Sequence, residues 1–267
     1  MADFDDRWLD LDFDKQPEFT FGDLGAPDEG LFGSYEDKYG VLSDAEIREA
    51  VEKADAEGGM MEGLTTRTHN QKQEGSCTCN ALGLLHEIIQ CEQSGDDSVI
   101  DVSPISLYKR VARSASSGSN IGEAAGELKS RGILPLDNAE NKARFDHTMP
   151  HTGFSTPFPK GWEETAIKLA IDEYTVVKTP EGFRSALVRR DPCVGGRDGH
   201  AICYVRLMWE NGRWVYKYKN SWGKWGDVFG VDDYGYGYDS ESKGVAASRY
   251  IVVGRTSRLI LPKSLAV

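Results

Sequence analysis

The chain has 267 residues, of which 39% are hydrophobic and 28% charged, a composition typical of one large globular domain or two small ones. Its net charge of −12 comes from the N-terminal fifth, because residues 1–55 hold 17 Asp and Glu against 5 Lys and Arg, whereas the remainder holds 26 of each. Without a basic face to neutralise phosphates, we expect no nucleic-acid partner. No run of 18 apolar residues occurs, so we expect no membrane span.

The acidic start and the cysteine count bear on location. "MADFDDRWLDLDFDKQ" has neither a basic nor an apolar stretch, so we expect no secretory signal peptide. Five cysteines are an odd number, which argues against a disulfide framework and favours free thiols in a reducing, cytoplasmic-type environment. Cleavage of a longer precursor remains an alternative.

Residues 1–57 differ in character from the rest of the chain. Residues 1–42 alternate acidic residues with aromatic residues and Leu, which fits either an exposed tail or an arm whose aromatic side chains dock on the main body. A helix is expected next, since Ser43 and Glu46 form a capping box and Gly58-Gly59 end the pattern. We therefore separate 1–57, as a pro-region or docking segment, from a domain over 58–267.

The domain divides into a helical part, about 70–160, and a β-rich part, about 161–267. Apolar spacing predicts helices over 78–91, 103–116 and 122–133. Runs of β-branched and aromatic residues predict strands over 173–178, 200–209, 213–220 and 248–254, with Asn211-Gly212 as a hairpin turn. Residues 232–244 are expected to be a plain loop rather than a calcium site. This order favours an α+β protein with a cleft between two lobes.

Cys77 and Cys79 lie one residue apart at the start of the first of these helices. Their spacing lacks both the pattern and the second ligand pair of a zinc site, so we expect no metal. A redox pair would need C-x-x-C. Two alternatives remain: buried packing, or a nucleophile at a helix N-terminus, where the dipole stabilises a thiolate. Cys77 follows the flexible Gly75-Ser76 and is the better candidate.

A catalytic cysteine needs a histidine from elsewhere in the chain. His69 lies in the loop before Cys77, and His86 lies too far along the same helix to meet its thiol. His147 and His151 lie in a connecting segment where solvent exposure is the simplest expectation. His200 opens a predicted strand in the other half of the chain, from which it can face Cys77 across a cleft.

The segment "KYKNSWGKWGD", 217–227, resembles the papain-like cysteine peptidases, the papain and cathepsin family. Their asparagine lies in N-S-W-G-x-x-W-G, and here Asn220-Ser221-Trp222-Gly223 precedes Trp225-Gly226, one residue early. "NQKQEGSCTCNA" resembles the family's N-Q-x-x-x-G-S-C, and is closer to its bacterial-type branch, similar to D-Q-G-Q-L-G-S-C-T-A-N-A. Gln, Cys, His and Asn follow in the family's order, and the resemblance extends over about 60–255.

This resemblance implies a papain-like two-lobed α+β fold, a helical lobe facing an antiparallel, barrel-like β lobe, and a cysteine endopeptidase without a cofactor. Cys77 would attack the peptide carbonyl and form a thioester, with His200 as base and acid. Asn220 would orient the imidazole, and Trp222 would shield that hydrogen bond. Gln71, six residues before Cys77, would donate to the oxyanion. Gly118 falls where the family has a glycine lining the substrate groove.

The sequence also departs from the family. "DPCVGGRDGH", 191–200, looks like a short loop where relatives carry a longer one, so subsite specificity does not transfer. Thr78 replaces the usual aromatic residue after the nucleophile, as in the bacterial branch. Residues 1–60 lack the pro-region signature of plant and animal members, and the family disulfides are missing.

Two function classes follow, with peptide or protein substrates expected for the first. One is a cysteine peptidase; the other is a catalytically silent papain-fold protein that binds a partner, with the acidic arm as a docking element. The complete set of Gln71, Cys77, His200 and Asn220 favours the peptidase, because a scaffold has no chemical need for all four. A different thiol hydrolase, such as a cell-wall amidase, fits the N-S-W-G stretch poorly.

Overall fold

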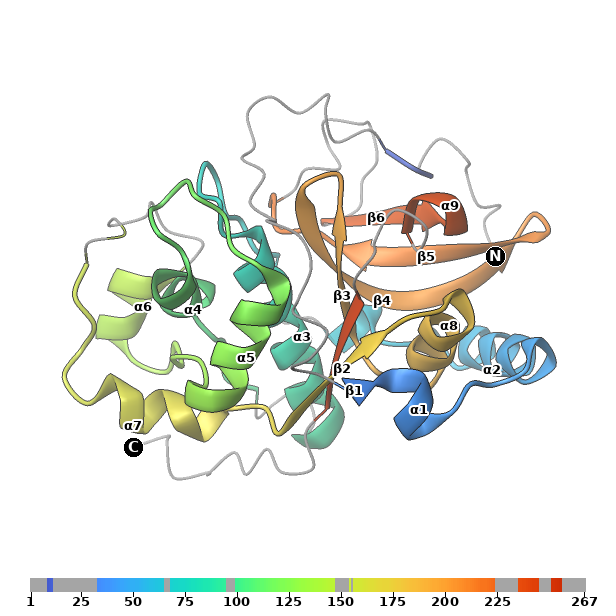
Figure 1. Cartoon of the computed structure of the whole chain (residues 1–267), viewed down its shortest axis with the longest axis horizontal. Coiled ribbons are helices and arrows are strands. Elements are labelled where there is room, and N and C mark those ends of the chain that lie inside the picture. The colour runs from blue at the N-terminus through green and yellow to red at the C-terminus, as the bar shows by residue number, and fades with distance from the viewer. Residues whose placement is uncertain are drawn as a thin grey trace.

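In the computed structural model, two lobes lie side by side (Figure 1). The described residues are 9–11, 33–64, 68–94, 99–146, 154, 156–223, 235–244 and 251–255. One lobe gathers helices α4 to α7, and the other is built on a twisted sheet with α1, α2, α8 and α9 around it, with α3 between them. The predicted α+β class is confirmed.

The helical lobe contains α3 (Cys77–Ser94), α4 (Pro104–Val111), α5 (Ile121–Arg131), α6 (Ala139–Phe145) and α7 (Trp162–Ala166), with a 3-10 turn at Ile167–Leu169. The three predicted helices are confirmed, but α4 ends at Val111 rather than at 116. Serine side chains compete for the backbone there. Arg113 and Ser114 donate their N–H groups to Ser117 Oγ, and Tyr108 Oη donates to Ser114 O, which fixes a non-helical loop.

The sheet has seven strands in the order β1-β2-β7-β3-β4-β5-β6. These are β1 (Gly33–Ser34), β2 (Glu173–Val177), β3 (Cys193–Arg197), β4 (His200–Glu210), β5 (Arg213–Lys219), β6 (Tyr236–Ser240) and β7 (Ile251–Arg255). All neighbours are antiparallel except β1 and β2. The Asn211-Gly212 hairpin is confirmed, and positive φ angles of 49° and 79° identify its turn as type I′.

Two segments expected to be loops contain strands. Residues 191–200 form β3 and a tight turn into β4, in which Asp198 and Gly199 have φ of 51° and 77°. The Asp-Gly dipeptide is typical of a hairpin turn, but the apolar run before it is too short to predict a strand by itself. Residues 236–244, expected to be loop, form edge strand β6 and α9 (Glu241–Gly244). β6 pairs with β5. A Cβ at Gly237 of β6 would lie 2.4 Å from the Tyr218 ring, so only a glycine leaves room for that ring.

The N-terminal segment packs against the β lobe where it is described. The predicted capped helix is α2 (Asp44–Ala56), with both bonds of the Ser43–Glu46 capping box present, and a 3-10 turn follows at Glu62–Leu64. Ahead of it, α1 (Tyr35–Tyr39) buries Tyr35, whose Oη donates to Asp191 Oδ2 at 2.8 Å. Tyr35 thus packs on the β lobe; the arm's Phe residues and Trp8, on which the docking interpretation also depends, lie outside the described residues.

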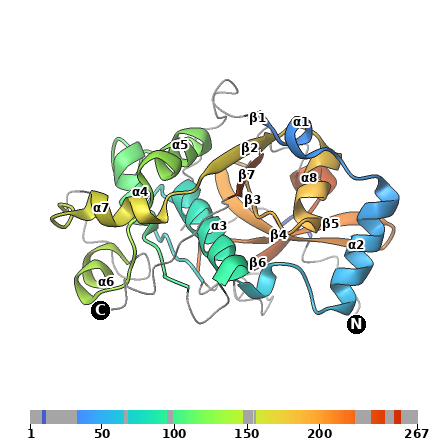
Figure 2. The same cartoon turned by 90° about the horizontal axis from the view of Figure 1, so that it is seen from below.

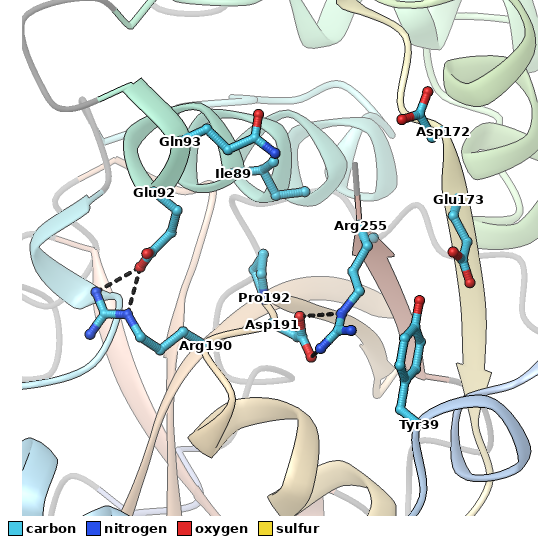
Figure 3. Close-up of a pocket in the computed structure, with 11 residues that line it drawn as sticks. Tyr39, Ile89, Glu92, Gln93, Asp172, Glu173, Arg190, Asp191, Pro192 and Arg255 are labelled. Atoms are coloured by element: carbon cyan, nitrogen blue, oxygen red, sulfur yellow. Dashed lines mark hydrogen bonds and ion pairs between the residues drawn. The ribbon is translucent and has the colours of Figure 1, made fainter. Parts of the chain in front are cut away.

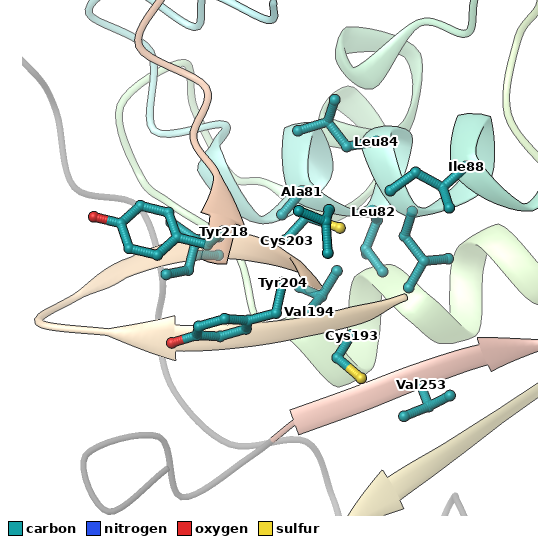
Figure 4. Packing of buried hydrophobic residues seen from close by; sticks show 14 of the residues in the cluster. Ala81, Leu82, Leu84, Ile88, Cys193, Val194, Cys203, Tyr204, Tyr218 and Val253 are labelled. Carbon is teal, nitrogen blue, oxygen red and sulfur yellow. The ribbon is translucent and has the colours of Figure 1, made fainter. Parts of the chain in front are cut away.

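The core is centred on α3 and β4. All side chains of β4 from His200 to Val205 are buried, because α3 covers one face and α8 (Pro180–Val188) the other (Figure 2). Tyr204 meets Phe183 of α8 edge-on, at a centroid distance of 5.1 Å. On the opposite face, Cys203 lies beside Ala81 of α3 (Figure 4). Helix α8 was not among the predicted helices, although Thr179 caps it and Pro180 occupies its first turn. None of the described helices could cross a membrane.

Candidate active site

Cys77 is the first residue of α3 and is fully buried. The Asn80 N–H donates to Ser76 O at 2.9 Å, which closes the first helical turn directly behind the cysteine. A thiol at this position lies at the positive end of the helix dipole, which stabilises its thiolate form. Thus the local structure suits a nucleophile.

The approach to Cys77 runs against Gly118. A Cβ at Gly75 would lie 2.7 Å from Gly118 N, so the two backbones touch and Gly75 must lack a side chain. The Gly75 N–H donates to Ala115 O at 3.1 Å, which joins the same two loops. Gly118 is buried and lines a pocket of about 410 Å³ with Ser117 and Arg113. The structure therefore places Gly118, the predicted groove residue, beside the loop that leads to Cys77.

His200 and Asn220 meet where β4 begins and β5 has just ended. The ring nitrogen Nε2 of His200 lies 2.7 Å from Asn220 Oδ1, which also accepts the Ser221 N–H at 2.7 Å. Because an amide oxygen only accepts, Nε2 carries the hydrogen. The Trp222 indole stacks on the imidazole with centroids 4.3 Å apart and an interplanar angle of 28°. All three side chains are buried, as expected for a shielded histidine–asparagine pair.

Burial governs the charge of His200. Its pKa is lowered to about 3: desolvation is the largest cause, the hydrogen bond to Asn220 opposes it, and the positive charge of Arg197 adds to it. The imidazole is therefore neutral in this state, with its hydrogen on Nε2. Nδ1 is then the basic nitrogen, able to take a proton from a thiol.

Gln71 is tied to the segment that carries Asn220. Its N–H donates to Ser221 O at 2.8 Å, and Ser221 Oγ donates to its Oε1 at 2.5 Å. The side-chain Nε2 donates one hydrogen to Glu74 O at 2.8 Å, and an amide nitrogen carries a second hydrogen. An antiparallel bridge between Asn70 and Trp222 continues the pairing. Sequence reasoning missed Ser221, although it stands inside the N-S-W-G motif.

The structure thus joins Gln71, His200, Asn220 and Trp222 in one hydrogen-bonded and stacked cluster. Cys77 begins the helix that packs against β4, the strand that begins with His200. Cys79 is buried, with Sγ 3.8 Å from Ser119 Oγ, and burial raises the pKa of its thiol.

The remaining candidates fall elsewhere. His69 and His86 are buried in hydrogen-bonded positions. His147, His151 and Trp225-Gly226 lie outside the described residues. Within the described part of the chain, no group of three His, Cys, Asp or Glu side chains could hold a metal ion.

A separate pocket of about 400 Å³ lies at the C-terminal end of α3 (Figure 3). Two ion pairs lie in its lining: Arg190 with Glu92, and Arg255 with Asp191. It contains none of the predicted site residues.

The sequence matches no family model and no curated protein. The structure, however, matches many solved ones. Xylellain, a cysteine protease from Xylella fastidiosa, is 16% identical at a TM-score of 0.64, over 90% of this chain and 97% of that one. A digestive procathepsin L2 proteinase from the Tenebrio molitor larval midgut is 15% identical at a TM-score of 0.64, and the match covers 92% of this chain and 81% of that one. Bromelain from Ananas comosus, in complex with the E64 inhibitor, is 16% identical at 0.54, over 73% and 95%.

The chain therefore has the papain-like fold. The likeness predicted from the Gln-Cys, His and N-S-W-G segments is confirmed at the level of the fold, and the match to xylellain fits the bacterial-type branch.

Proposed function

We propose that this protein is a cysteine-type peptidase that hydrolyses peptide bonds through a thioester on Cys77. The observation that carries the proposal is the buried 2.7 Å contact between His200 and Asn220 under Trp222, on the strand against which the Cys77 helix packs. A hydrogen bond that fixes one imidazole nitrogen leaves the other to serve a nucleophile. The complete set Gln71, Cys77, His200 and Asn220 supports peptidase chemistry over a silent scaffold.

In the proposed reaction, His200 Nδ1 takes the thiol proton of Cys77, and the thiolate attacks the carbonyl carbon of the peptide bond. The negative charge that forms on the carbonyl oxygen is stabilised by the Gln71 amide and the Cys77 N–H. As the C–N bond breaks, the imidazolium gives its proton to the leaving amine, and a thioester remains. Water then attacks the thioester while His200 takes its proton. The C–S bond breaks, the acyl group leaves as a carboxylic acid, and the imidazolium returns its proton to the Cys77 sulfur.

The charge of the Cys77 thiolate also explains how the buried His200 imidazole can be protonated during this cycle. Burial alone lowers the pKa of His200, so an imidazolium would be costly in the resting site. A neighbouring thiolate favours the imidazolium, and Asn220 Oδ1 accepts its Nε2 hydrogen in both states. The Asn220 contact therefore keeps the ring in one orientation as the charge changes.

The acidic arm is proposed to bind the catalytic domain. Leu9 bridges Tyr238 of β6, and Asp10 accepts bonds from Ser240 at 2.8 and 2.6 Å. Further along, β1 pairs with β2 at the other edge of the sheet. Cys77 and His200 are both 0% exposed, so a substrate reaches the thiol only when part of the cover moves. That burial is also the observation that favours the silent-scaffold alternative.

Labelling with an irreversible epoxide inhibitor, followed by mass mapping, tests the proposal. We expect label on Cys77 in the wild type and in Cys79→Ala, and loss of label in His200→Ala, together with hydrolysis of a peptide library. Label on Cys79 alone, or equal label on all five cysteines, would contradict the mechanism. A folded protein that neither labels nor cleaves peptides, with or without residues 1–32, would establish the scaffold alternative.

A further inference from the structure

A buried polar chain lies behind the first turns of α3 and takes no part in the proposed reaction. His69 Nδ1 lies 3.2 Å from Asn80 Oδ1, and His69 Nε2 lies 3.2 Å from Glu87 Oε2. Asn80 Nδ2 donates to Ser76 O at 3.0 Å and to Ser76 Oγ at 3.1 Å. His69, Ser76, Asn80 and Glu87 are all 0% exposed. Polar groups removed from water in this way must satisfy one another.

The donors and acceptors of this chain can be assigned. Ser76 O only accepts, so the Asn80 amide nitrogen must face it and the Asn80 oxygen must face His69. Glu87 Oε1 accepts the Val102 N–H at 3.2 Å, and Oε2 faces the other ring nitrogen. Both ring nitrogens of His69 therefore face oxygen acceptors. A neutral imidazole has one N–H. Beside an ionised Glu87, the ring nitrogen without a hydrogen would therefore point its lone pair at a lone pair of the oxygen that it faces.

The site consequently holds one additional proton. It can lie on the ring or on Glu87. On the ring, it gives each nitrogen a hydrogen to donate to the oxygen that it faces, and it pairs the buried Glu87 carboxylate with a positive charge. Glu87 is the charged group that α3 places against the ring, and the 220–223 segment meets the His69 backbone through the Gly223 N–H. Next to Glu87, His86 differs: Gln90 Nε2 donates to its Nδ1, so its hydrogen lies on Nε2 and points to Leu169 O. Burial lowers the pKa of His86 to about 4.

We propose that His69 is a positioning residue, held as an imidazolium between Asn80 and Glu87, that fixes the Gln71 segment to the helix of Cys77. His69 stands two residues before Gln71, and its carbonyl accepts the Gly223 N–H at 2.8 Å. Its ring contacts reach residues three and ten positions after Cys77 on α3. One residue thus links the segment of the proposed oxyanion donor and the Trp222-Gly223 segment, through its backbone, to the proposed nucleophile's helix, through its ring. The consequence for activity rests on the proposed function; the charge of His69 does not.

Glu87→Gln is the variant that separates charge from contact. The Gln oxygen can still accept the Val102 N–H, and its amide nitrogen can donate to His69 Nε2. A neutral ring with its hydrogen on Nδ1 then satisfies Asn80 as well. The variant keeps every contact of the chain while removing the need for the imidazolium.

Ring nitrogen-15 NMR of the full chain near neutral pH tests the charge. We expect both His69 nitrogens to be protonated in the wild type, and only Nδ1 in Glu87→Gln. The neutral His86 ring is the internal reference, and His69→Gln assigns the signal by its loss. A neutral His69 ring in the wild type overturns the imidazolium, whether or not the protein is a peptidase.

Positioning is tested by kinetics and by hydrogen exchange of the Gln71 N–H, which donates to Ser221 O. We expect His69→Gln to lower kcat by about 10²-fold with little change in KM, as for a misplaced catalytic group, and to speed exchange at Gln71. Glu87→Gln should change neither kcat nor the exchange rate of the Gln71 N–H strongly. Equal effects of both variants, or unchanged exchange in His69→Gln, overturn the positioning role. If the wild type has no peptidase activity, the proposed function fails and the exchange measurement decides the positioning role.

Discussion

Ser221 and Gln71, 150 positions apart in sequence, are joined by a side-chain hydrogen bond of 2.5 Å and a backbone bond of 2.8 Å. Ser221 donates to the Gln71 side-chain oxygen, which turns the amide nitrogen away from it. The Ser221 N–H also donates to Asn220 Oδ1, which is the acceptor for His200. Two adjacent residues, Asn220 and Ser221, therefore hold both His200 and Gln71 in place. The proposed oxyanion donor and the proposed base thus share one support.

From this arrangement, we predict that Gln71→Ala lowers kcat for peptide hydrolysis by about 10²–10³-fold, because one preorganised donor to the developing oxyanion is lost. KM should change little, since the effect concerns the transition state. Gln73→Ala is the matched control: Gln73 is exposed, two residues away, and six residues before Cys79. Comparable losses in the two variants would contradict the role given to Gln71.

The buried carboxyl group of Glu74 should make the free energy of unfolding depend on pH. Its side chain is 7% exposed, and burial raises its pKa to about 7, opposed by the Ser76 hydrogen bond and the charge of Lys109. In the unfolded chain the carboxyl ionises near its ordinary value of 4.5. As the pH rises between these values, the unfolded state loses its proton first, so the free energy of unfolding falls.

We therefore expect the free energy of unfolding of Glu74→Gln, measured by urea unfolding relative to the wild type, to be more favourable at about pH 8 than at about pH 5. Glu52→Gln, on the exposed face of α2, serves as the control. An unchanged pH profile in Glu74→Gln would show that the carboxyl ionises at its ordinary pH in the folded chain.

The sequence predicts most of the main helices, the Asn211-Gly212 hairpin and the order of the site residues, because each depends on local patterns such as a capping box, a turn dipeptide or a motif. It does not predict β3 and β6, whose Gly-rich runs form strands only because neighbouring strands pair with them. Nor does it predict the links Ser221–Gln71 and His69–Asn80–Glu87. Those depend on which segments meet in space, and a serine or histidine in a loop carries no local signal of its partner.

Arg197 and Asp239 form a fully buried ion pair, with Nη1 and Oδ1 2.8 Å apart. Tyr204 Oη donates to the same carboxylate at 2.9 Å, and Arg197 also donates to Leu11 O in the N-terminal segment. Removing one partner of such a pair leaves a buried charge without its counter-charge.

We predict that Asp239→Ala lowers the free energy of unfolding by about 3–5 kcal/mol. Burial raises the pKa of Asp239 to about 7, so the comparison belongs at about pH 8, where the carboxylate is ionised. Asp198→Asn is the control, since that partly exposed carboxylate lies 3.5 Å from Arg197, Asn tolerates the positive φ of 51°, and loss of the charge should cost less than about 1 kcal/mol. Equal effects from the two substitutions would show that burial of the pair does not govern its energy.

A substrate must gain access to Cys77, which is fully buried in the intact chain. Residues 9–11 are fixed at β6, and residues 33–34 pair with β2, so the described parts of the arm are attached at opposite edges of the sheet that contains His200. Deleting residues 1–55 would remove Tyr35, Ile47 and Val51 from the core, whereas deleting residues 1–32 leaves β1, α1 and α2 in place. The shorter deletion therefore separates the arm's effect on access from loss of the fold.

We expect deletion of residues 1–32 to raise both kcat/KM for a peptide and the rate at which an epoxide labels Cys77, because the thiol is 0% exposed in the intact chain. Deletion of residues 1–8 keeps the Leu9–Leu11 attachment and should leave both rates unchanged. Circular dichroism and the melting temperature should confirm that each truncated chain is folded. If both rates stay the same in the folded 33–267 chain, the arm does not limit access, and the cover over Cys77 belongs to the catalytic domain itself.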